Sequence, residues 1–169
     1  MKIVMSNPDD LSDSDIIQTS IKVKAIIKTD NKILFVKCND IYQLPGGRIK
    51  TNETLPDGLK REVQEETGIV LKNEYDAFFL RKYYSKKYPD AGINQLTFIY
   101  YYFIETDDKI NESNMNLDLW EKEHNFNLQY ISYEDINDIL TVNKNKGGKA
   151  EVIAKEMEEV FMEVGVLNV

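Results

Sequence analysis

Three glutamates in one predicted helix have the residue type and the spacing that bind metal ions. Glu62, Glu65 and Glu66 stand at i, i+3 and i+4, so their carboxylates share an arc of about 100° on the helix surface. Like charges at this spacing cost roughly 0.2–0.5 kcal/mol per pair, so helix stability does not account for the cluster. Carboxylate oxygens are the ligands that Mg²⁺ and Mn²⁺ prefer, and a bound cation would make the cluster favourable. The helix alone leaves a metal site and a solvated acidic face as alternatives.

The residues around these glutamates favour the metal site. Gly46 and Gly47 let the backbone approach a ligand closely, because neither carries a Cβ. Glu53 comes just before the helix, and Arg61 is placed to hold it by a forked hydrogen bond. Gly58 occupies a helix position where glycine costs about 1 kcal/mol relative to alanine. Clearance for a bound phosphate and close packing against a strand explain Gly58 equally well.

Local rules predict where this helix begins and ends. Thr54 is a good N-cap, and Asp57 three residues later makes a pattern close to a capping box. Pro56 is acceptable in the first turn, where its missing N–H is no loss. Gly68 is the expected left-handed residue at the C-terminal end. The helix is therefore predicted over 55–67, with its apolar stripe of Leu55, Leu59 and Val63 facing the core.

The segment 47–69 resembles the complete signature of the Nudix hydrolase (MutT-like) family, the Nudix box. Every signature position is filled: Gly47-x5-Glu53-x7-Arg61-Glu62-Val63-x-Glu65-Glu66-x-Gly68-Ile69. The resemblance implies an α/β fold, an α/β/α sandwich with a mixed sheet in which the box forms a loop-helix-loop. It also implies hydrolysis of a nucleoside diphosphate linked to another moiety, with Mg²⁺ or Mn²⁺ as cofactor.

The resemblance also implies roles for residues of the box. Glu62, Glu65 and Glu66 would be metal ligands, joined by a backbone carbonyl of Gly46 or Gly47. Arg61 and Glu53 would shape the site, and all five charged side chains count as candidate catalytic residues. Lys50 and the pair Thr51-Asn52 depart from the usual pattern, but neither is a signature position.

Relatives often recruit a further glutamate from outside the box, as a general base or an extra ligand. Glu123 is the best candidate, because it shortly precedes a predicted strand at 127–131. Glu121, Glu112 and Glu105 remain open as alternatives. The same long segment, 106–126, contains Trp120, which is either part of a binding loop or a packing anchor.

Candidate substrate-binding residues lie in two other places. Tyr42 precedes the Gly-Gly turn and can either stack on a base or close the core. Residues 81–88 carry four cations and three tyrosines with no acid, in a chain of net charge −8. Their Lys and Arg either keep a hairpin end soluble or contact phosphate. In the second case the contacts come from Arg81, Lys86, Lys87 and Tyr88.

The rest of the chain is predicted as one domain over 1–169 with mixed strands and helices. Residues 1–19 read as an N-terminal extension, and residues 143–148 as a flexible break. The predicted strands are 21–27, 33–38, 77–84, 96–104 and 128–133, with a turn at 89–92 and a helical turn or two over 133–140. An amphipathic helix over 149–164 packs on the domain or, less readily, forms a homodimer contact.

Composition excludes several classes of function. The net charge of −8 disfavours partners such as nucleic acid or an anionic membrane surface. One cysteine and one histidine rule out an intramolecular disulfide and disfavour His- or Cys-rich metal sites. No apolar stretch approaches the roughly 20 residues of a membrane span, so the expected location is the cytoplasm.

Two functions remain. The first is a metal-dependent pyrophosphohydrolase acting on a small nucleotide or nucleotide-sugar substrate. The second is a non-catalytic Nudix-fold module that binds a nucleotide and regulates another process. Loss of box glutamates is the sign of the second, and here none is lost. The sequence therefore favours the enzyme.

Overall fold

A seven-stranded mixed sheet forms the centre of the computed structural model, which describes residues 1–88 and 92–167. The sheet order is β1-β5-β6-β2-β3-β4, with β7 paired to β3. The pairs β1–β5 and β2–β6 are parallel, and the other pairs are antiparallel. The strands are β1 (Lys2–Ser6), β2 (Gln18–Thr29), β3 (Lys32–Cys38), β4 (Ile41–Gln43), β5 (Ala77–Tyr88), β6 (Ile93–Glu105) and β7 (Asn127–Ser132). Most of the turn predicted at 89–92 lies outside the described residues.

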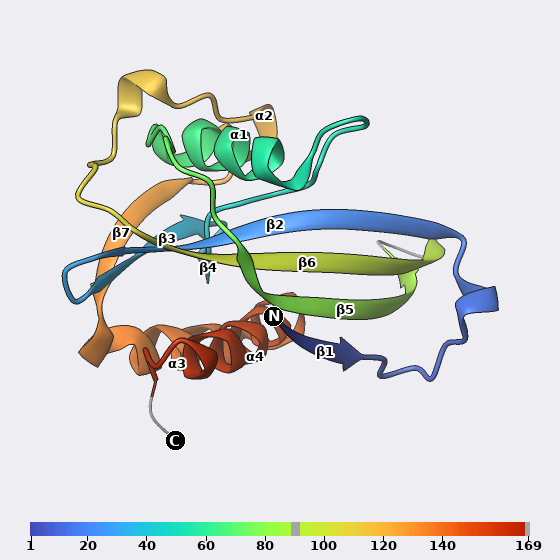
Figure 1. Cartoon of the computed structure of the whole chain (residues 1–169). Coiled ribbons are helices and arrows are strands. Elements are labelled where there is room, and N and C mark those ends of the chain that lie inside the picture. The colour runs from blue at the N-terminus through green and yellow to red at the C-terminus, as the bar shows by residue number, and fades with distance from the viewer. Residues whose placement is uncertain (89–91, 168–169) are drawn as a thin grey trace.

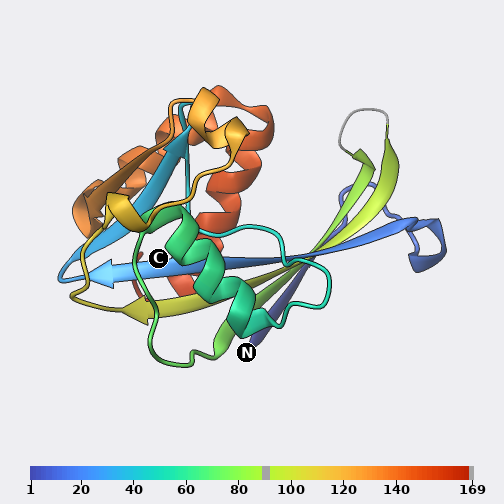
Figure 2. The same ribbon diagram turned by 90° about the horizontal axis from the view of Figure 1, so that it is seen from above.

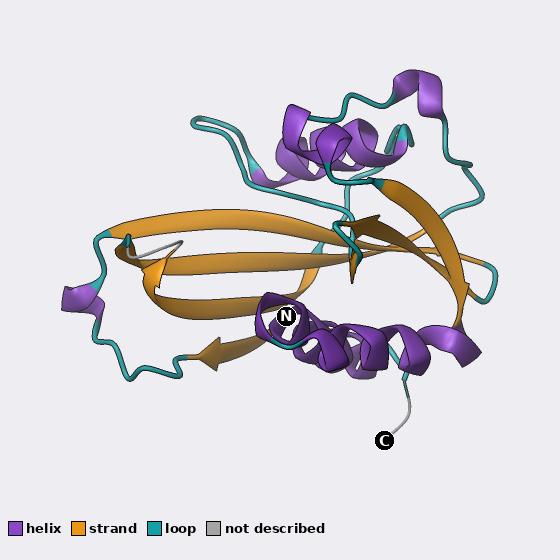
Figure 3. Cartoon of the chain, turned by 180° about the vertical axis from the view of Figure 1, so that it is seen from behind, coloured by secondary structure: helices purple, strands orange, loops and turns teal. Residues whose placement is uncertain are grey.

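Helices cover both faces of this sheet. Helix α1 (Leu55–Thr67) and the short α2 (Leu119–Glu123) lie on one side, and α3 (Ile136–Lys146) and α4 (Gly148–Glu163) lie on the other (Figures 1 and 3). Each side has its own apolar core, one built around Leu59 and Val63 and the other around Phe35 and Phe161. The expected α/β/α sandwich with a mixed, open sheet is confirmed. None of the described helices combines the length and the apolar composition that crossing a bilayer requires.

Helix α1 has the predicted bounds, and its ends have the predicted chemistry. The Thr54 hydroxyl oxygen accepts the Asp57 N–H at 3.2 Å, and the hydroxyl donates to the Asp57 carboxylate at 2.6 Å. At the other end Gly68 has φ 71° and donates its N–H to the Gln64 carbonyl. The buried stripe contains Leu59 and Val63. Glu66 lies on the same buried face as Leu59 and Val63, and Glu62 and Glu65 are half-buried, so the caps and the burial of this face together fix the orientation of the three glutamates.

The C-terminal region is more helical than predicted. The segment 143–146 belongs to α3, and the break is confined to Gly147, which has φ 66°. Gly148, with φ 54°, already begins α4. Asn143, which read as part of a flexible tract, is fully buried. Its amide accepts the Tyr42 N–H at 3.1 Å and donates to the Tyr42 carbonyl at 2.7 Å, which docks α3 onto β4. Because the hydrogen-bond partner of Asn143 is a backbone group far away in the sequence, the local sequence does not indicate that Asn143 lies in a buried part of a helix.

The two ends of the chain pack on the sheet. The apolar stripe of α4 is buried in the core, which confirms packing on the domain and leaves that stripe unavailable for a homodimer contact. The expected N-terminal extension is only partly correct, because residues 2–6 form β1 and pair with β5 at the sheet edge. Seen from above, β2, β5 and β6 extend beyond the area that the helices cover (Figure 2).

Candidate functional site

The glutamates of α1 line a cleft of about 740 Å³. Its walls come from α1, the middle of β2, the loop after β4 and the segment 116–126 around α2. The acidic lining residues are Glu62, Glu65, Glu66, Asp118 and Glu121. The basic lining residues are Lys22, Lys24, Arg48, Lys50, Arg61 and Lys122. Carboxylates and cations therefore meet in one space, which suits a ligand that carries phosphates together with a metal ion.

Glu66 is the most buried of the three glutamates, with a relative exposure of 6%. One carboxylate oxygen accepts the Gly46 N–H at 2.6 Å. Burial raises the pKa of Glu66 to about 8, and the nearby Lys24 charge and the Gly46 N–H offset only part of that effect. The protein therefore compensates the negative charge of the Glu66 carboxylate only in part.

Arg61 holds the other carboxylates of the box. Its Nε and Nη2 donate to the two oxygens of Glu53 at 2.6 and 2.8 Å, which is the predicted fork. Its Nη1 also donates to Glu62 at 2.7 Å and to Glu65 at 2.8 Å, which the sequence did not indicate. The Arg61 hydrogen bonds hold the pKa of Glu53 down at about 2, and they raise the pKa of Arg61. One guanidinium therefore orients three carboxylates.

Three glycines are required by close contacts in this region. A Cβ on Gly47 would lie 2.4 Å from a carboxylate oxygen of Glu62, and Gly46 has φ 130°, a conformation that side chains rarely adopt. A Cβ on Gly58 would lie 2.0 Å from the Ile49 side chain. Gly58 is therefore explained by close packing, although against the loop before α1 and not against a strand.

The donor set fits a hard divalent cation. In the described part of the chain no three acidic, His or Cys side chains already converge as ligands, since Arg61 binds Glu62 and Glu65. Glu66 and Glu121 nevertheless line the same cleft, and burial raises the pKa of both. A buried and a half-buried carboxylate in one cleft favour an added positive charge. The Gly47 carbonyl accepts the Val23 N–H at 3.0 Å, so Gly46 is the less committed of the two carbonyls.

Of the glutamates considered outside the box, the structure brings Glu121, and not the predicted Glu123, to the cleft. Glu121 lines the cleft next to Glu66, whereas Glu123 is exposed and is not a lining residue. Residues i and i+2 of a helix point about 200° apart, so α2 directs the Glu121 and Glu123 side chains to opposite sides. The Asp118 and Glu121 side chains and backbones bond reciprocally at 2.7 and 2.8 Å, which forms the capping box of α2. The helix α2 was not predicted from the sequence.

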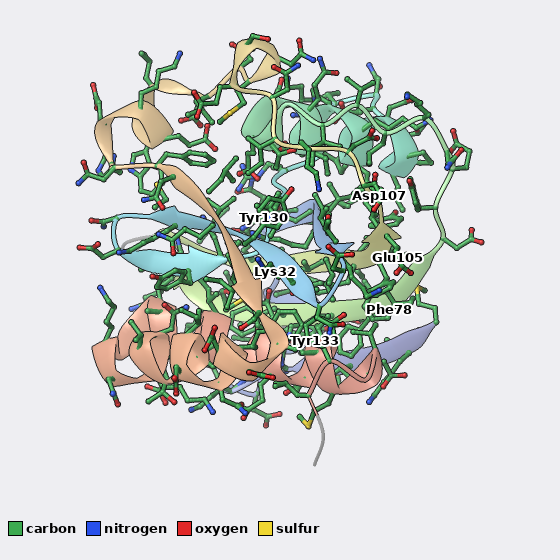
Figure 4. The ribbon with its side chains drawn as sticks, turned by 90° about the vertical axis from the view of Figure 1, so that its left-hand side faces the viewer. Lys32, Phe78, Glu105, Asp107, Tyr130 and Tyr133 are labelled. Carbon is green, nitrogen blue, oxygen red and sulfur yellow. The ribbon has the colours of Figure 1, made fainter. Side chains whose placement is uncertain are left out.

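The other two glutamates considered lie elsewhere. Glu112 lines a separate hollow of about 530 Å³ beside the cleft. Glu105 ends β6 and is paired with Lys28. Figure 4 places Glu105 beside Asp107 and near Phe78 at the edge of the sheet, and none of the three lines the cleft.

Most of the predicted substrate-binding residues are not at the cleft. Arg81 is 7% exposed and its Nη2 lies 3.1 Å from both carboxylate oxygens of Glu159 on α4. Side chains alternate along β5, and Arg81 falls on the face that α4 covers. Lys86 lines a separate hollow of about 340 Å³, and Lys87 is exposed near the end of the strand. The side chain of Tyr88 lies outside the described residues.

Tyr42 closes the core and does not line the cleft. Its ring packs edge-on against Phe35 with centroids 6.5 Å apart, and Lys37 Nζ lies 5.4 Å from the ring centre. Its neighbour Gln43 points the other way and lines the cleft. Of the two alternatives for Tyr42, the structure supports packing.

Two lysines at the cleft were missed. Lys22 and Lys24 alternate with Val23 and Ala25 in β2, which is the pattern of a strand with one solvent-exposed face. Burial, and then the Lys24 charge, lowers the pKa of Lys22 to about 8. Within the described residues the Lys22 side chain has no hydrogen bond or ion pair, and Lys24 donates to the Leu44 carbonyl at 2.8 Å. A partly buried amine without a protein acceptor is suited to an anionic ligand.

Known proteins resemble this chain in sequence and in fold. The sequence model of the NUDIX domain matches residues 20–155. An ADP-ribose pyrophosphatase of Methanocaldococcus jannaschii is 38% identical over 58 residues, 31% of this chain and 34% of that protein. An 8-oxo-dGTP diphosphatase of Buchnera aphidicola subsp. Schizaphis graminum is 39% identical over 75 residues, 41% of this chain and 56% of that protein. The chain thus aligns with between a third and just over a half of these relatives.

A solved structure matches the fold. The MutT NUDIX hydrolase from Burkholderia pseudomallei superimposes with a TM-score of 0.54 at 17% identity, over 69% of this chain and 84% of that one. At this identity the likeness concerns the fold alone. The domain match covers most of the chain, including every residue of the box and both walls of the cleft. The sandwich, the box helix and this match together place the chain in the Nudix family.

Proposed function

We propose that this protein is a metal-dependent pyrophosphohydrolase that cleaves the diphosphate linkage of a nucleoside diphosphate joined to another moiety. The observation that carries the proposal is the shared cleft, in which the buried Glu66 and its neighbours Glu62 and Glu65 face Lys22 and Lys24. A diphosphate substrate needs cations around its oxygens and a base for the attacking water. The names of the two curated relatives, one acting on ADP-ribose and one on 8-oxo-dGTP, agree with this class of substrate.

The charged side chains of the box and Glu121 have distinct parts in this proposed reaction. Glu62, Glu65 and Glu66, with the Gly46 carbonyl, would hold Mg²⁺ or Mn²⁺, which when bound neutralises phosphoryl charge and acidifies a water molecule. Arg61 fixes the direction of Glu62 and Glu65, and Glu53 in turn fixes Arg61. Glu121 can take the proton of the attacking water, since it is the glutamate of α2 that lines the cleft together with Glu66.

Lysines on β2 bind the phosphates in this scheme. Replacing Lys22 by Gln is expected to raise KM about 5- to 20-fold while kcat changes less than threefold, since the lost hydrogen bonds to an anionic group are worth about 1–2 kcal/mol. Steady-state kinetics on a diphosphate substrate measures both constants. Lys32→Gln is the matched control, because Lys32 is an exposed lysine at the start of β3 that does not line the cleft (Figure 4). An unchanged KM in Lys22→Gln would remove Lys22 from the phosphate site.

The assignment of Glu121 is tested against Glu123. Glu121→Gln is expected to lower kcat by about 10²-fold, the usual contribution of a general base, and Glu123→Gln to leave it within twofold. A glutamine at 121 still offers an oxygen to the Asp118 N–H, so the cap of α2 survives. Comparing kcat of the two variants under saturating Mg²⁺ separates the roles. Loss of turnover in Glu123→Gln alone would reverse the assignment.

A substrate screen tests the proposed function as a whole. The protein is incubated with ADP-ribose, deoxynucleoside triphosphates, dinucleoside polyphosphates and sugar nucleotides, in Mg²⁺, Mn²⁺ or EDTA. We expect phosphate-containing products from at least one class, and none in EDTA. Binding of a nucleotide without any hydrolysis would instead support the non-catalytic, regulatory alternative. The proposed location is the cytoplasm, where a lone buried thiol such as Cys38 stays reduced.

A further inference from the structure

Trp120 is a large aromatic side chain that the fold leaves open to the cleft. It lies on α2, is 48% exposed and lines the same cleft as Glu66. Neither of the two apolar cores includes it. An indole that is neither in a core nor fully solvated has a large apolar face available for a ligand. The packing-anchor alternative for Trp120 is therefore not supported.

His124 holds the indole in a fixed orientation. The two rings are stacked with centroids 4.3 Å apart and an angle of 19° between their planes. The His124 Nδ1–H donates to the Trp120 carbonyl at 2.6 Å, and the His124 carbonyl accepts the Asn39 N–H at 2.7 Å. The ring pair is thereby tied to the turn between β3 and β4. With His124 against one face, Trp120 offers its other face as a preorganised surface, which lowers the entropy cost of binding.

The surroundings of Trp120 match the parts of a nucleotide. Leu117 and Phe126 line the same wall of the cleft and make it apolar, whereas Lys22 and Lys24 line the basic part. Glu121, the residue that follows Trp120, lines the same cleft as Glu66. A ligand with a flat base at α2 and phosphates at the glutamates and lysines would complement all three regions.

We propose that Trp120, backed by His124, is the platform on which the base of the nucleotide substrate stacks. The inference rests on the proposed function in taking the cleft as a nucleotide site, and it adds the orientation of the substrate within it. Stacking on an aromatic side chain tolerates any base, because every base has a π face. The platform thus selects nucleoside-containing diphosphates over diphosphates without a base.

Fluorescence gives a direct test, because Trp120 is the only tryptophan of the chain. The full chain with Mg²⁺ is titrated with adenosine α,β-methylene diphosphate, whose P–C–P bridge resists hydrolysis, and with methylenediphosphonate, which has the same bridge and no nucleoside. Calorimetry reports the affinity of each ligand. We expect saturable quenching by the nucleoside ligand and none by methylenediphosphonate. Nucleoside binding that leaves the emission unchanged, or no nucleoside binding at all, overturns the inference.

Variants of Trp120 separate stacking from general damage. Trp120→Ala is expected to weaken the nucleoside ligand about 5- to 100-fold, and Trp120→Phe to restore most of the affinity. The affinity for methylenediphosphonate is the internal control and stays within twofold, which also shows that α2 remains in place. Equal weakening of both ligands would mean that Trp120 only supports the fold. Hydrolysis in the substrate screen without quenching by the nucleoside ligand would refute the stacking platform but not the enzyme. Quenching by the nucleoside ligand without hydrolysis of any substrate in the screen would refute the enzyme but not the platform.

Discussion

Glu66→Gln is expected to lower turnover by about three orders of magnitude and, at the same time, to stabilise the metal-free protein. Turnover falls because charge stabilisation by a held cation is worth several kcal/mol in the transition state. Stability rises because a buried carboxylate without full compensation is replaced by a neutral side chain of the same shape, a gain on the order of 1–2 kcal/mol, or about 2–8 °C in Tm. The Gly46 N–H still finds an oxygen acceptor.

The pH dependence of stability gives this prediction a second signature. In the folded chain the pKa of Glu66 is raised from 4.5 to about 8 by burial. Between these values the unfolded chain has lost the proton and the folded chain keeps it, so the free energy of unfolding falls as the pH rises. In EDTA, Tm should therefore drop between pH 5 and pH 8 more steeply in wild type than in Glu66→Gln. Activity of Glu66→Gln within a few-fold of wild type would contradict the assignment of Glu66.

Arg61→Ala is expected to cost about 2–4 kcal/mol of stability and to abolish measurable turnover. The change leaves Glu53, Glu62 and Glu65 without their shared cation, although the side chains of the first two are only 13% exposed. For a domain of this size the loss equals about 5–15 °C in Tm. Lys60→Ala is the control, because Lys60 pairs with the exposed Glu74 and such pairs are worth about 0–1 kcal/mol.

Acid unfolding reports on the same ion pair. The pKa of Glu53 is lowered from 4.5 to about 2 by Arg61, so this pair adds stability above pH 4.5 that is lost as the pH falls toward 2. Urea unfolding followed by circular dichroism between pH 2 and pH 6 should show a shallower slope in Arg61→Ala than in wild type. Identical slopes, or a stability loss no larger than in Lys60→Ala, would show that Arg61 does not hold the box together.

The box helix was predictable because its signals are local. Thr54, Asp57 and Gly68 act within one turn of each helix end, and the spacing of the glutamates fixes their common face. The partner of Arg61 was also within reach, since Glu53 is eight residues away. The additional bonds of Arg61 to Glu62 and Glu65 depend on rotamers, which spacing alone does not determine.

The part of the site outside the box was predicted less well, for two reasons. The five residues of α2 are too few for a periodicity signal, yet Asp118 and Glu121 have the capping-box spacing that would have indicated a helix start and selected Glu121. Arg81 was a candidate for substrate binding because it lies in a basic segment. Its partner in the structure, Glu159, lies 78 residues away, so local sequence does not indicate this ion pair. Lys22 and Lys24 could not be identified as cleft residues from the strand pattern, because their burial comes from a cleft that tertiary packing creates.

Binding of Mn²⁺ tests the central claim, that these glutamates hold a divalent cation, most directly. Free Mn²⁺ is followed by electron paramagnetic resonance while it is titrated with wild type or with the triple variant Glu62→Gln, Glu65→Gln, Glu66→Gln. The account predicts that wild type depletes the free-ion signal, that Mg²⁺ restores it by competition, and that the folded triple variant leaves it unchanged. Equal depletion by wild type and by the triple variant would contradict it.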